Sequence, residues 1–114
     1  MAKIKSKLSG ATAVVQVSGR VTIDEGSGEL RDSLRCILED GKNRIVLNCS
    51  KVDFMDSSGF GVLVECYTSA KKHGGDLRMA SPSFKVKDIL SLTKMDKVIR
   101  SYDSEKDAVE SFNK

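Results

Sequence analysis

The strongest constraint on the fold is a change of hydrophobic period near the middle of the chain. Ile45-Val46-Leu47 is a continuous apolar run, which is typical of a strand buried on both faces. Further along, apolar residues recur at helical spacing, at Phe60, Leu63, Tyr67 and Ala70, with Val62 and Cys66 widening the stripe. The pattern therefore predicts a buried strand that leads through a loop into an amphipathic helix.

The loop residues Asp56, Ser57 and Ser58 lie where that helix begins. All three are good N-cap types, because a short side-chain oxygen can accept hydrogen bonds from the free N–H groups of the first turn. Gly59 and Gly61 follow in the first turn or so, where each costs roughly 1 kcal/mol relative to alanine. Such a local loss of helix stability favours a functional site, and bare N–H groups at a helix start can hold an anion.

The remaining patterns predict strands that alternate with helices after an initial hairpin. Strands are expected at 4–8 and 13–17, with Gly19 closing the hairpin, and then at 44–49, 77–80 and 97–100. The first two helices are expected to end at Gly41 and at Gly74-Gly75. A third helix is expected to begin at Ser81-Pro82, with the serine as N-cap and the proline as first residue. A fourth is expected to begin at Ser104, which with Asp107 resembles a capping box. This order predicts one α/β domain over residues 1–114, with a mixed sheet of about four to five strands, an N-terminal antiparallel hairpin and about four covering helices.

The charge balance and the apolar pattern bear on whether the chain binds nucleic acid or a membrane. Nineteen Lys and Arg against sixteen Asp and Glu give a formal charge of +3 with the two signs interleaved, and there are four Phe, two Tyr and no Trp to stack on bases. No apolar run approaches the ~20 residues of a membrane span, and the basic N-terminus is not followed by a signal-peptide core. We expect a cytoplasmic protein that binds neither nucleic acid nor membrane.

The three cysteines do not predict a metal site. Cys36, Cys49 and Cys66 are far apart and form no CxxC or Cys/His pattern. Each falls within an apolar-patterned element, so we expect buried free thiols, in keeping with a reducing compartment. We expect neither a metal ion nor a cofactor.

The chain also lacks the residues of three other chemistries. A serine nucleophile needs a base, and the sole histidine, His73, lies some fifteen residues later on the same helix, roughly 22 Å away at about 1.5 Å per residue. A receiver domain would need an acidic pair after the first strand, where Gly19-Arg20-Val21-Thr22 stands instead. Nucleotide-binding glycine loops are absent, apart from the weak Gly59-Phe60-Gly61.

Phosphorylation of Ser57 or Ser58 is a further possibility. A phosphoryl group there would carry about −1.5 to −2 charges at pH 7. The helix start could tolerate that charge without unfolding, so the effect would fall on the surface where a partner docks. From chemistry alone, this interpretation and simple helix capping by the two serines stay equally open.

The segment Asp56-Ser57-Ser58-Gly59, which we call the corner, and its surroundings resemble the STAS domain family, particularly the small bacterial anti-sigma-factor antagonists. The resemblance rests on Ile45 to Asn48 and Val52 to Leu63, and it extends to the later segments Gly74 to Leu77, the Ser81-Pro82 helix and Leu92 to Ile99. It covers nearly the whole chain, and the Asp-Ser-Ser-Gly corner is a fairly specific signal.

The resemblance implies a switch between protein partners rather than an enzyme. In this family the unphosphorylated antagonist binds an anti-sigma factor, commonly a serine kinase of the GHKL ATPase type, and so frees a sigma factor. The kinase phosphorylates the first serine after the aspartate, which corresponds to Ser57, and a phosphatase resets it. By the same resemblance Asp56 lies beside the phosphate, Ser58 caps the helix, and Gly59 and Gly61 let the partner approach closely.

One loop departs from the family pattern. The family often carries an acidic residue in a Gly-x-Leu-Asp pattern after the second strand, where this chain has Gly19-Arg20-Val21-Thr22. We expect this loop beside the phosphoserine corner, so Arg20 and Thr22 join the predicted partner-binding residues. The alternatives are a STAS module that senses a nucleotide or anion at the bare N–H groups of Gly59 to Gly61, and a stressosome-like scaffold subunit.

Overall fold

The structure, a computed structural model, describes residues 2–113. Its strands are β1 (Lys3–Ser9), β2 (Thr12–Val21), β3 (Arg44–Met55), β4 (Asp76–Ala80) and β5 (Ser101–Tyr102). Its helices are α1 (Ser27–Glu39), α2 (Ser57–Lys72), α3 (Phe84–Leu92) and α4 (Glu105–Ser111), with a 3-10 turn η1 (Met95–Lys97). Within these residues, no helix combines the length and apolarity needed to cross a lipid bilayer.

The five strands form one mixed sheet in the order β1-β2-β3-β4-β5. β1 runs antiparallel to β2, with Lys3 opposite Ser18, and the other neighbouring strands are parallel. β3 is the middle strand, and Ile45, Val46 and Leu47 are fully buried, which confirms the expectation of a strand covered on both faces. The sheet, its N-terminal antiparallel pair and the four helices confirm the predicted fold class.

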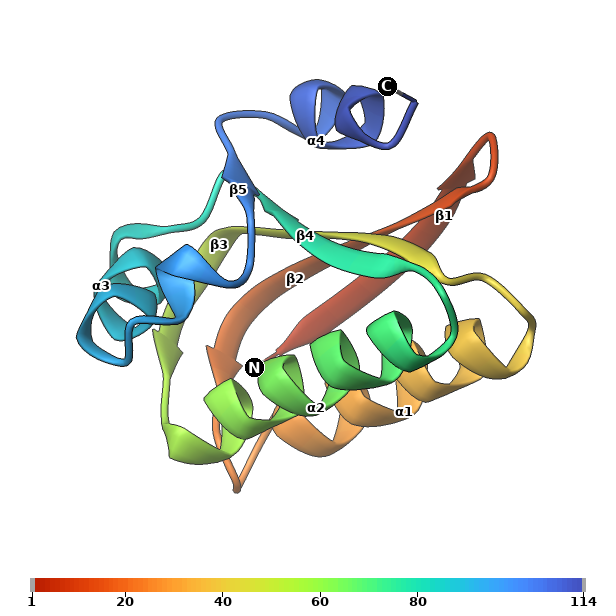
Figure 1. Ribbon diagram of the computed structural model, residues 1–114. Helices are drawn as coiled ribbons and strands as arrows, with labels where there is room; N and C mark the ends of the chain where they lie inside the picture. The colour runs from red at the N-terminus through yellow and green to blue at the C-terminus, as the bar shows by residue number, and fades with distance from the viewer. Residues whose placement is uncertain (1, 114) are drawn as a thin grey trace.

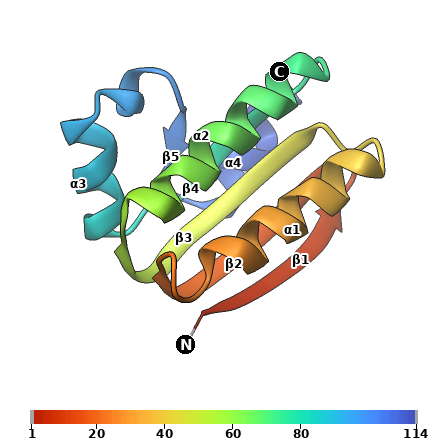
Figure 2. The same cartoon turned by 90° about the horizontal axis from the view of Figure 1, so that it is seen from below.

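The helices divide unequally between the two faces of the sheet (Figures 1 and 2). α1 and α2 lie side by side on one face, and their Leu30, Leu34 and Leu63 pack with Ile45 and Leu47 in the main core. Among the described helices, α4 lies on the opposite face, over a small second core of Val14, Val46, Ala80 and Ala108. Alternate residues of β3 therefore enter different cores.

Two predicted strand boundaries are wrong. Gly19 does not close the hairpin, because β2 continues through it to Val21 with a φ of +87° at Gly19. That left-handed conformation, which glycine adopts without strain, lies where the register between β2 and β3 is irregular. β3 likewise continues beyond 49 to Met55, so the middle strand carries the chain directly to the Asp56 corner.

Two later predictions are also wrong. Ser81 does not cap α3; its φ is +48° and its hydroxyl donates to the carbonyl oxygen of Asp103 at 2.7 Å, whereas Ser83 accepts from the N–H of Val86 at 3.4 Å. The segment 97–100 is not a strand: its first residue, Lys97, ends η1, its Ile99 is buried in the main core, and it leads to the short β5. The capping role of Ser104 is confirmed, because its Oγ accepts from the N–H of Asp107 at 3.1 Å.

The cysteines divide into two buried thiols and one exposed thiol. Cys49 and Cys66 lie in the core, and burial raises the pKa of Cys49 to about 12 and, with the charge of Glu65, that of Cys66 to about 11. Cys36 is exposed, so the expectation that it is buried is wrong. It lies beside the exposed Arg35 on α1, off the stripe of Leu30 and Leu34.

Replacing a residue of the main core tests the packing of α2 on the sheet. Leu63→Ala should lower the free energy of unfolding by about 2–5 kcal/mol, because Leu63 is fully buried and its removal leaves a cavity. Leu92→Ala, at a side chain that is 77% exposed, is the matched control and should change it by less than about 0.5 kcal/mol. Urea unfolding of the three proteins measures both values, and equal losses would contradict the assignment of the core.

Candidate functional site

Asp56 connects the start of α2 to the loop that follows β2. It is the N-cap residue of α2, and its Oδ1 accepts a hydrogen bond from the N–H of Gly59 at 3.0 Å. Its Oδ2 accepts from the N–H of Ile23 at 3.1 Å, and its own N–H donates to the carbonyl oxygen of Val21 at 3.2 Å. One carboxylate therefore holds together two segments that are far apart in the sequence.

The same carboxylate occupies the site where the alternative hypothesis places an external anion. The N–H of Gly59 points at Asp56 Oδ1, and the N–H of Phe60 donates to the carbonyl oxygen of Asp56 at 3.0 Å. The hydrogen bond from Gly59, followed by that from Ile23, holds the pKa of Asp56 below its usual range against the opposing effect of desolvation. The expectation of bare N–H groups at Gly59 is therefore wrong.

The two serines of the corner lie in different environments. Ser57, the first residue of α2, is exposed, and no group among residues 2–113 is hydrogen-bonded to its hydroxyl. Ser58 is half-buried, and its Oγ donates to Oγ of the buried Ser27 in α1 at 3.1 Å. Ser58 thus links α2 to α1 instead of capping α2, which corrects the role expected for it. The outward hydroxyl of the pair is that of Ser57.

The two glycines also differ. A side chain at Gly59 would overlap the carbonyl oxygen of Val21 and lie 2.8 Å from Val21 Cγ1 and 2.9 Å from Met55 Cγ. Gly59 is buried, so its missing side chain lets α2 approach the end of β2, and the expected contact with a partner is replaced by this internal one. Gly61 is exposed, with open space where its side chain would be, so its place in a partner surface stays a prediction.

Thr22 and Arg20 lie beside the corner, as expected, but face different ways. Thr22 is 7% exposed; its Oγ1 accepts from the N–H of Glu25 at 3.2 Å, so it shapes the loop and offers little surface to a partner. Arg20 is exposed, lies 3.4 Å from the Glu25 carboxylate and stacks over the ring of Phe54 at 5.0 Å. Of the two, Arg20 belongs to the surface.

The structure adds two apolar residues that the sequence patterns did not single out. Ile23 is 76% exposed and donates its backbone N–H to Asp56, so its side chain projects from the loop bonded to the corner. Phe54 is 39% exposed and lies under Arg20. An apolar residue between Thr22 and the acidic pair Asp24-Glu25 was the available signal for Ile23.

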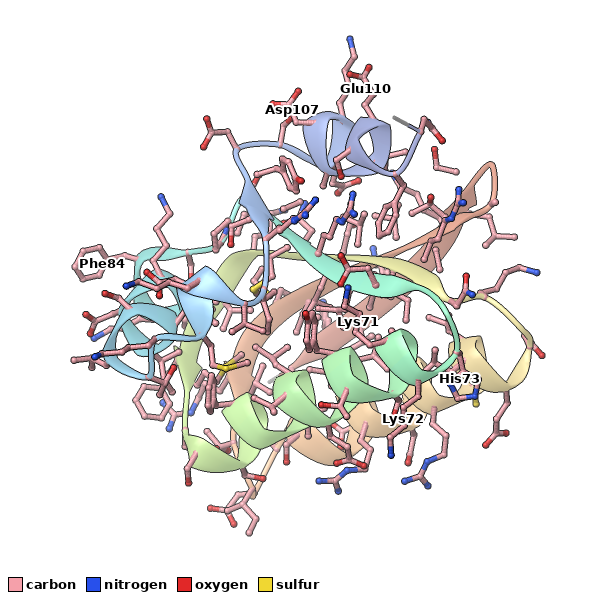
Figure 3. All side chains as sticks on the ribbon, in the orientation of Figure 1. Lys71, Lys72, His73, Phe84, Asp107 and Glu110 are labelled. Carbon is pink, nitrogen blue, oxygen red and sulfur yellow. The ribbon has the colours of Figure 1, made fainter. Side chains whose placement is uncertain are left out.

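His73, the only histidine of the chain, lies away from the corner. His73 is the C-cap residue of α2, at the opposite end of the helix from Ser57, and its Nδ1 lies 2.7 Å from the carbonyl oxygen of Ser69 (Figure 3). Among residues 2–113, no group of three His, Cys, Asp or Glu side chains is placed to hold a metal ion. The corner therefore presents an exposed hydroxyl and an anchored carboxylate, with His73 at the other end of α2.

Comparison with known proteins connects this arrangement to one family. The family model for the STAS domain matches residues 3–108. A Thermotoga maritima protein that is provisionally named an anti-sigma factor antagonist is 36% identical over 77 residues, which are 68% of each chain. The anti-sigma F factor antagonist of Paenibacillus polymyxa is 30% identical over 92 residues, covering 73% of this chain and 79% of that protein.

Solved structures share the fold. The crystal structure of the Thermotoga maritima protein superimposes with a TM-score of 0.91 at 27% identity, over 97% of this chain and 95% of that one. The anti-sigma factor antagonist SpoIIAA superimposes in its unphosphorylated form with a TM-score of 0.75, at 17% identity over 97% and 98% of the two chains. The phosphorylated form of SpoIIAA from Bacillus gives 0.78, at 17% identity over 96% and 99%.

The pH dependence of stability should reveal the hydrogen bonds to Asp56. Because folding lowers the pKa of this carboxyl, its stabilisation is present above its ordinary pKa of about 3.9 and is lost as the pH falls through the folded value. Asp56→Asn keeps a capping oxygen but cannot titrate, so the stability difference between wild type and variant should be largest near neutral pH and shrink below about pH 4. Urea unfolding at several pH values measures it, and a difference independent of pH would contradict the assignment.

Alanine at the two glycines should have opposite effects. Gly59→Ala should destabilise the protein by about 1–3 kcal/mol, because the added methyl group meets Val21 and Met55. Gly61→Ala should stabilise it by roughly 0.5–1 kcal/mol, because its space is open and alanine favours a helix. Thermal unfolding measures both shifts, and a Gly59→Ala protein as stable as wild type would contradict the close approach of α2 to β2.

Proposed function

This chain belongs to the STAS domain family, and from that premise we propose that it is an anti-sigma factor antagonist switched by phosphorylation of Ser57. Two kinds of observation support the proposal. Relatives that match most of the chain carry the name anti-sigma factor antagonist, and SpoIIAA, which shares the fold, has been solved in unphosphorylated and phosphorylated forms. The chain itself has an exposed serine directly after the aspartate that caps α2.

The observation that carries the proposal is the contrast between Ser57 and Ser58. A kinase must bring the hydroxyl of its substrate to the terminal phosphate of ATP, so it needs a hydroxyl that projects from the surface. Ser57 meets that requirement, whereas Ser58 is half-buried and bonded to Ser27. In the proposed reaction the Ser57 oxygen forms the new bond to the γ-phosphorus, ADP leaves, and the serine proton passes to the kinase's base.

A phosphate on Ser57 would act on the surface and leave the fold in place. Two N–H donors of the helix start, those of Gly59 and Phe60, are already bonded to Asp56. The new charge of about −1.5 to −2 would therefore add to that of the Asp56 carboxylate and stay exposed to solvent. A partner that covers the corner would have to desolvate both charges, which opposes binding.

The exposed apolar side chains beside the corner indicate what a partner would bury. Ile23 projects from the loop that is bonded to Asp56, and Phe54 lies under Arg20 at the end of β3. We propose that the unphosphorylated protein presents this small apolar area, with Ser57 and Arg20, to an anti-sigma factor that has serine kinase activity. A phosphatase acting on phosphorylated Ser57 would restore binding, and the chain would have no catalytic activity of its own.

The switch can be tested with four forms of the protein as baits in a lysate of the source organism. Wild type and Ser57→Ala should retain the same kinase, whereas Ser57→Asp should bind it at least about tenfold more weakly, because a fixed charge faces the partner. Ser58→Ala is the matched control and should bind like wild type. Titration of each form with the isolated kinase measures the affinities.

The position of the phosphate gives a separate test. After incubation with that kinase and ATP, the tryptic peptide 52–71 should carry one phosphoryl group, and fragmentation should place it on Ser57. Phosphate on Ser58, or a Ser57→Asp protein that binds the kinase as tightly as wild type, would contradict the proposal.

A further inference from the structure

A basic concavity lies on the face of the sheet opposite α1 and α2, and we call it the rear concavity. It measures about 320 Å³ and is lined by Lys3, Lys5, Gln16, Val17, Ser18, Asn48, Ser50 and Lys51. These residues come from β1, β2 and β3, whereas α4 covers Val14, Val46 and Ala80 further along the same face (Figure 1). The rear concavity is thus the part of this face that α4 leaves open, and its lining residues do not include Asp56, Ser57 or Ser58.

The strand register gathers lysines around this opening. Lys3 and Lys5 lie two residues apart on β1, so their Cα atoms are roughly 7 Å apart and their side chains are on the same face of the sheet. They lie opposite Ser18 and Gln16 of β2, respectively. Ser18 in turn lies opposite Lys51 of β3, so Lys3, Ser18 and Lys51 form a row across three strands. The Cα atoms of the two lysines in that row are roughly 10 Å apart, within the combined reach of their side chains.

An irregularity in β3 brings Lys51 to this face. Between the pairs Gln16–Asn48 and Ser18–Lys51, β2 advances by two residues and β3 by three. Such a bulge re-aims side chains, and it lets Ser50 and Lys51 both line the concavity while Val52 enters the main core. Strict alternation would have placed Ser50 here and turned Lys51 towards the core.

The lining offers hydrogen-bond donors with positive charge and contains no carboxylate. The nearby Glu105 of α4 accepts from the side-chain amides of Gln16 and Asn48 at 2.7 Å each and lies 3.4 Å from Lys7. Lys7 therefore balances the charge of Glu105. Within residues 2–113, Lys3, Lys5 and Lys51 have no acidic partner.

Protection of an edge strand does not account for the whole set. Lysines on an edge such as β1 discourage pairing with another chain, and this explains Lys3 and Lys5. Lys51 lies on the middle strand, where no edge needs protection, yet it faces the same opening. The combination of a concave floor, hydroxyl donors at Ser18 and Ser50, and three ammonium groups is suited to an anion that accepts several hydrogen bonds.

We infer that the rear concavity binds a small anion that carries a diphosphate group. Its volume is at the lower end of the range for small-molecule sites, which suits a compact ligand. A diphosphate spans more than one ammonium group and presents acceptors only, which matches the ammonium and hydroxyl donors of the lining. The lining contains no aromatic ring, so the diphosphate itself is the recognised group, whether it is inorganic or part of a nucleotide.

Calorimetry at low salt with the full chain tests this site, using inorganic pyrophosphate and ADP as probes. Lys51→Gln and Lys5→Gln should each weaken pyrophosphate binding by at least about fivefold, because each removes a charged donor. Lys72→Gln, at the C-terminal end of α2 (Figure 3), is the control because it removes the same charge outside the concavity. It should change the affinity for pyrophosphate by less than about twofold. Orthophosphate and AMP, with one phosphate each, should bind more weakly than the two probes.

The outcomes separate the source of the ligand from the existence of the site. Equal affinities for pyrophosphate and ADP would assign the site to the diphosphate alone, and tighter binding of ADP would assign it to a nucleotide. Absence of binding for both probes, or equal weakening by Lys72→Gln and Lys51→Gln, would overturn the proposal. Ser57→Asp should leave pyrophosphate binding unchanged, so this test does not depend on the proposed switch.

Discussion

The hydrogen bonds of the Asp56 carboxylate hold the functional corner together. One oxygen caps α2 through Gly59, and the other fixes the loop after β2 through Ile23. Because Gly59 has no side chain, α2 can lie against Val21 at the distance that these bonds require. Of the two serines on this support, Ser57 is the one whose hydroxyl is exposed to solvent. A rigid support of this kind means that a chemical change at one hydroxyl can alter what the corner binds without altering how the domain folds.

Local patterning was sufficient to predict most of the fold. The buried run Ile45-Val46-Leu47 and the helical stripe through Leu63 are strong signals, since each has a single clear period. The errors fall where tertiary contacts override local preference. Gly19 continues a strand because of its register with β3, and the Ser81-Pro82 pair is displaced from the start of α3 because Ser81 is bonded to Asp103. Such long-range contacts leave no trace in the local pattern.

The location of the candidate site was predictable from the sequence, whereas the role of each of its residues was less so. Residue type and spacing located Asp56, Ser57 and Ser58 at a helix start, but they could not say which serine would face outwards. That depends on Ser27, thirty-one residues away, which bonds to Ser58. Thr22 was predicted in the partner surface because its loop is near the corner, and Gly59 because of the resemblance to the STAS family. The structure buries both. The rear concavity was invisible in the sequence, because Lys3 and Lys51 meet only through strand register.

The small apolar core beneath α4 has a consequence for local opening of the native state. Its only fully buried residue, within the described chain, is Ala108, and the second core beneath it is small compared with that under α1 and α2. Regions with few buried apolar contacts open first in the native state, so the amide hydrogens of α4 should exchange with solvent well before those of β3. Each opening would uncover Val46 and release Glu105 from Lys7, momentarily making one end of the sheet more basic.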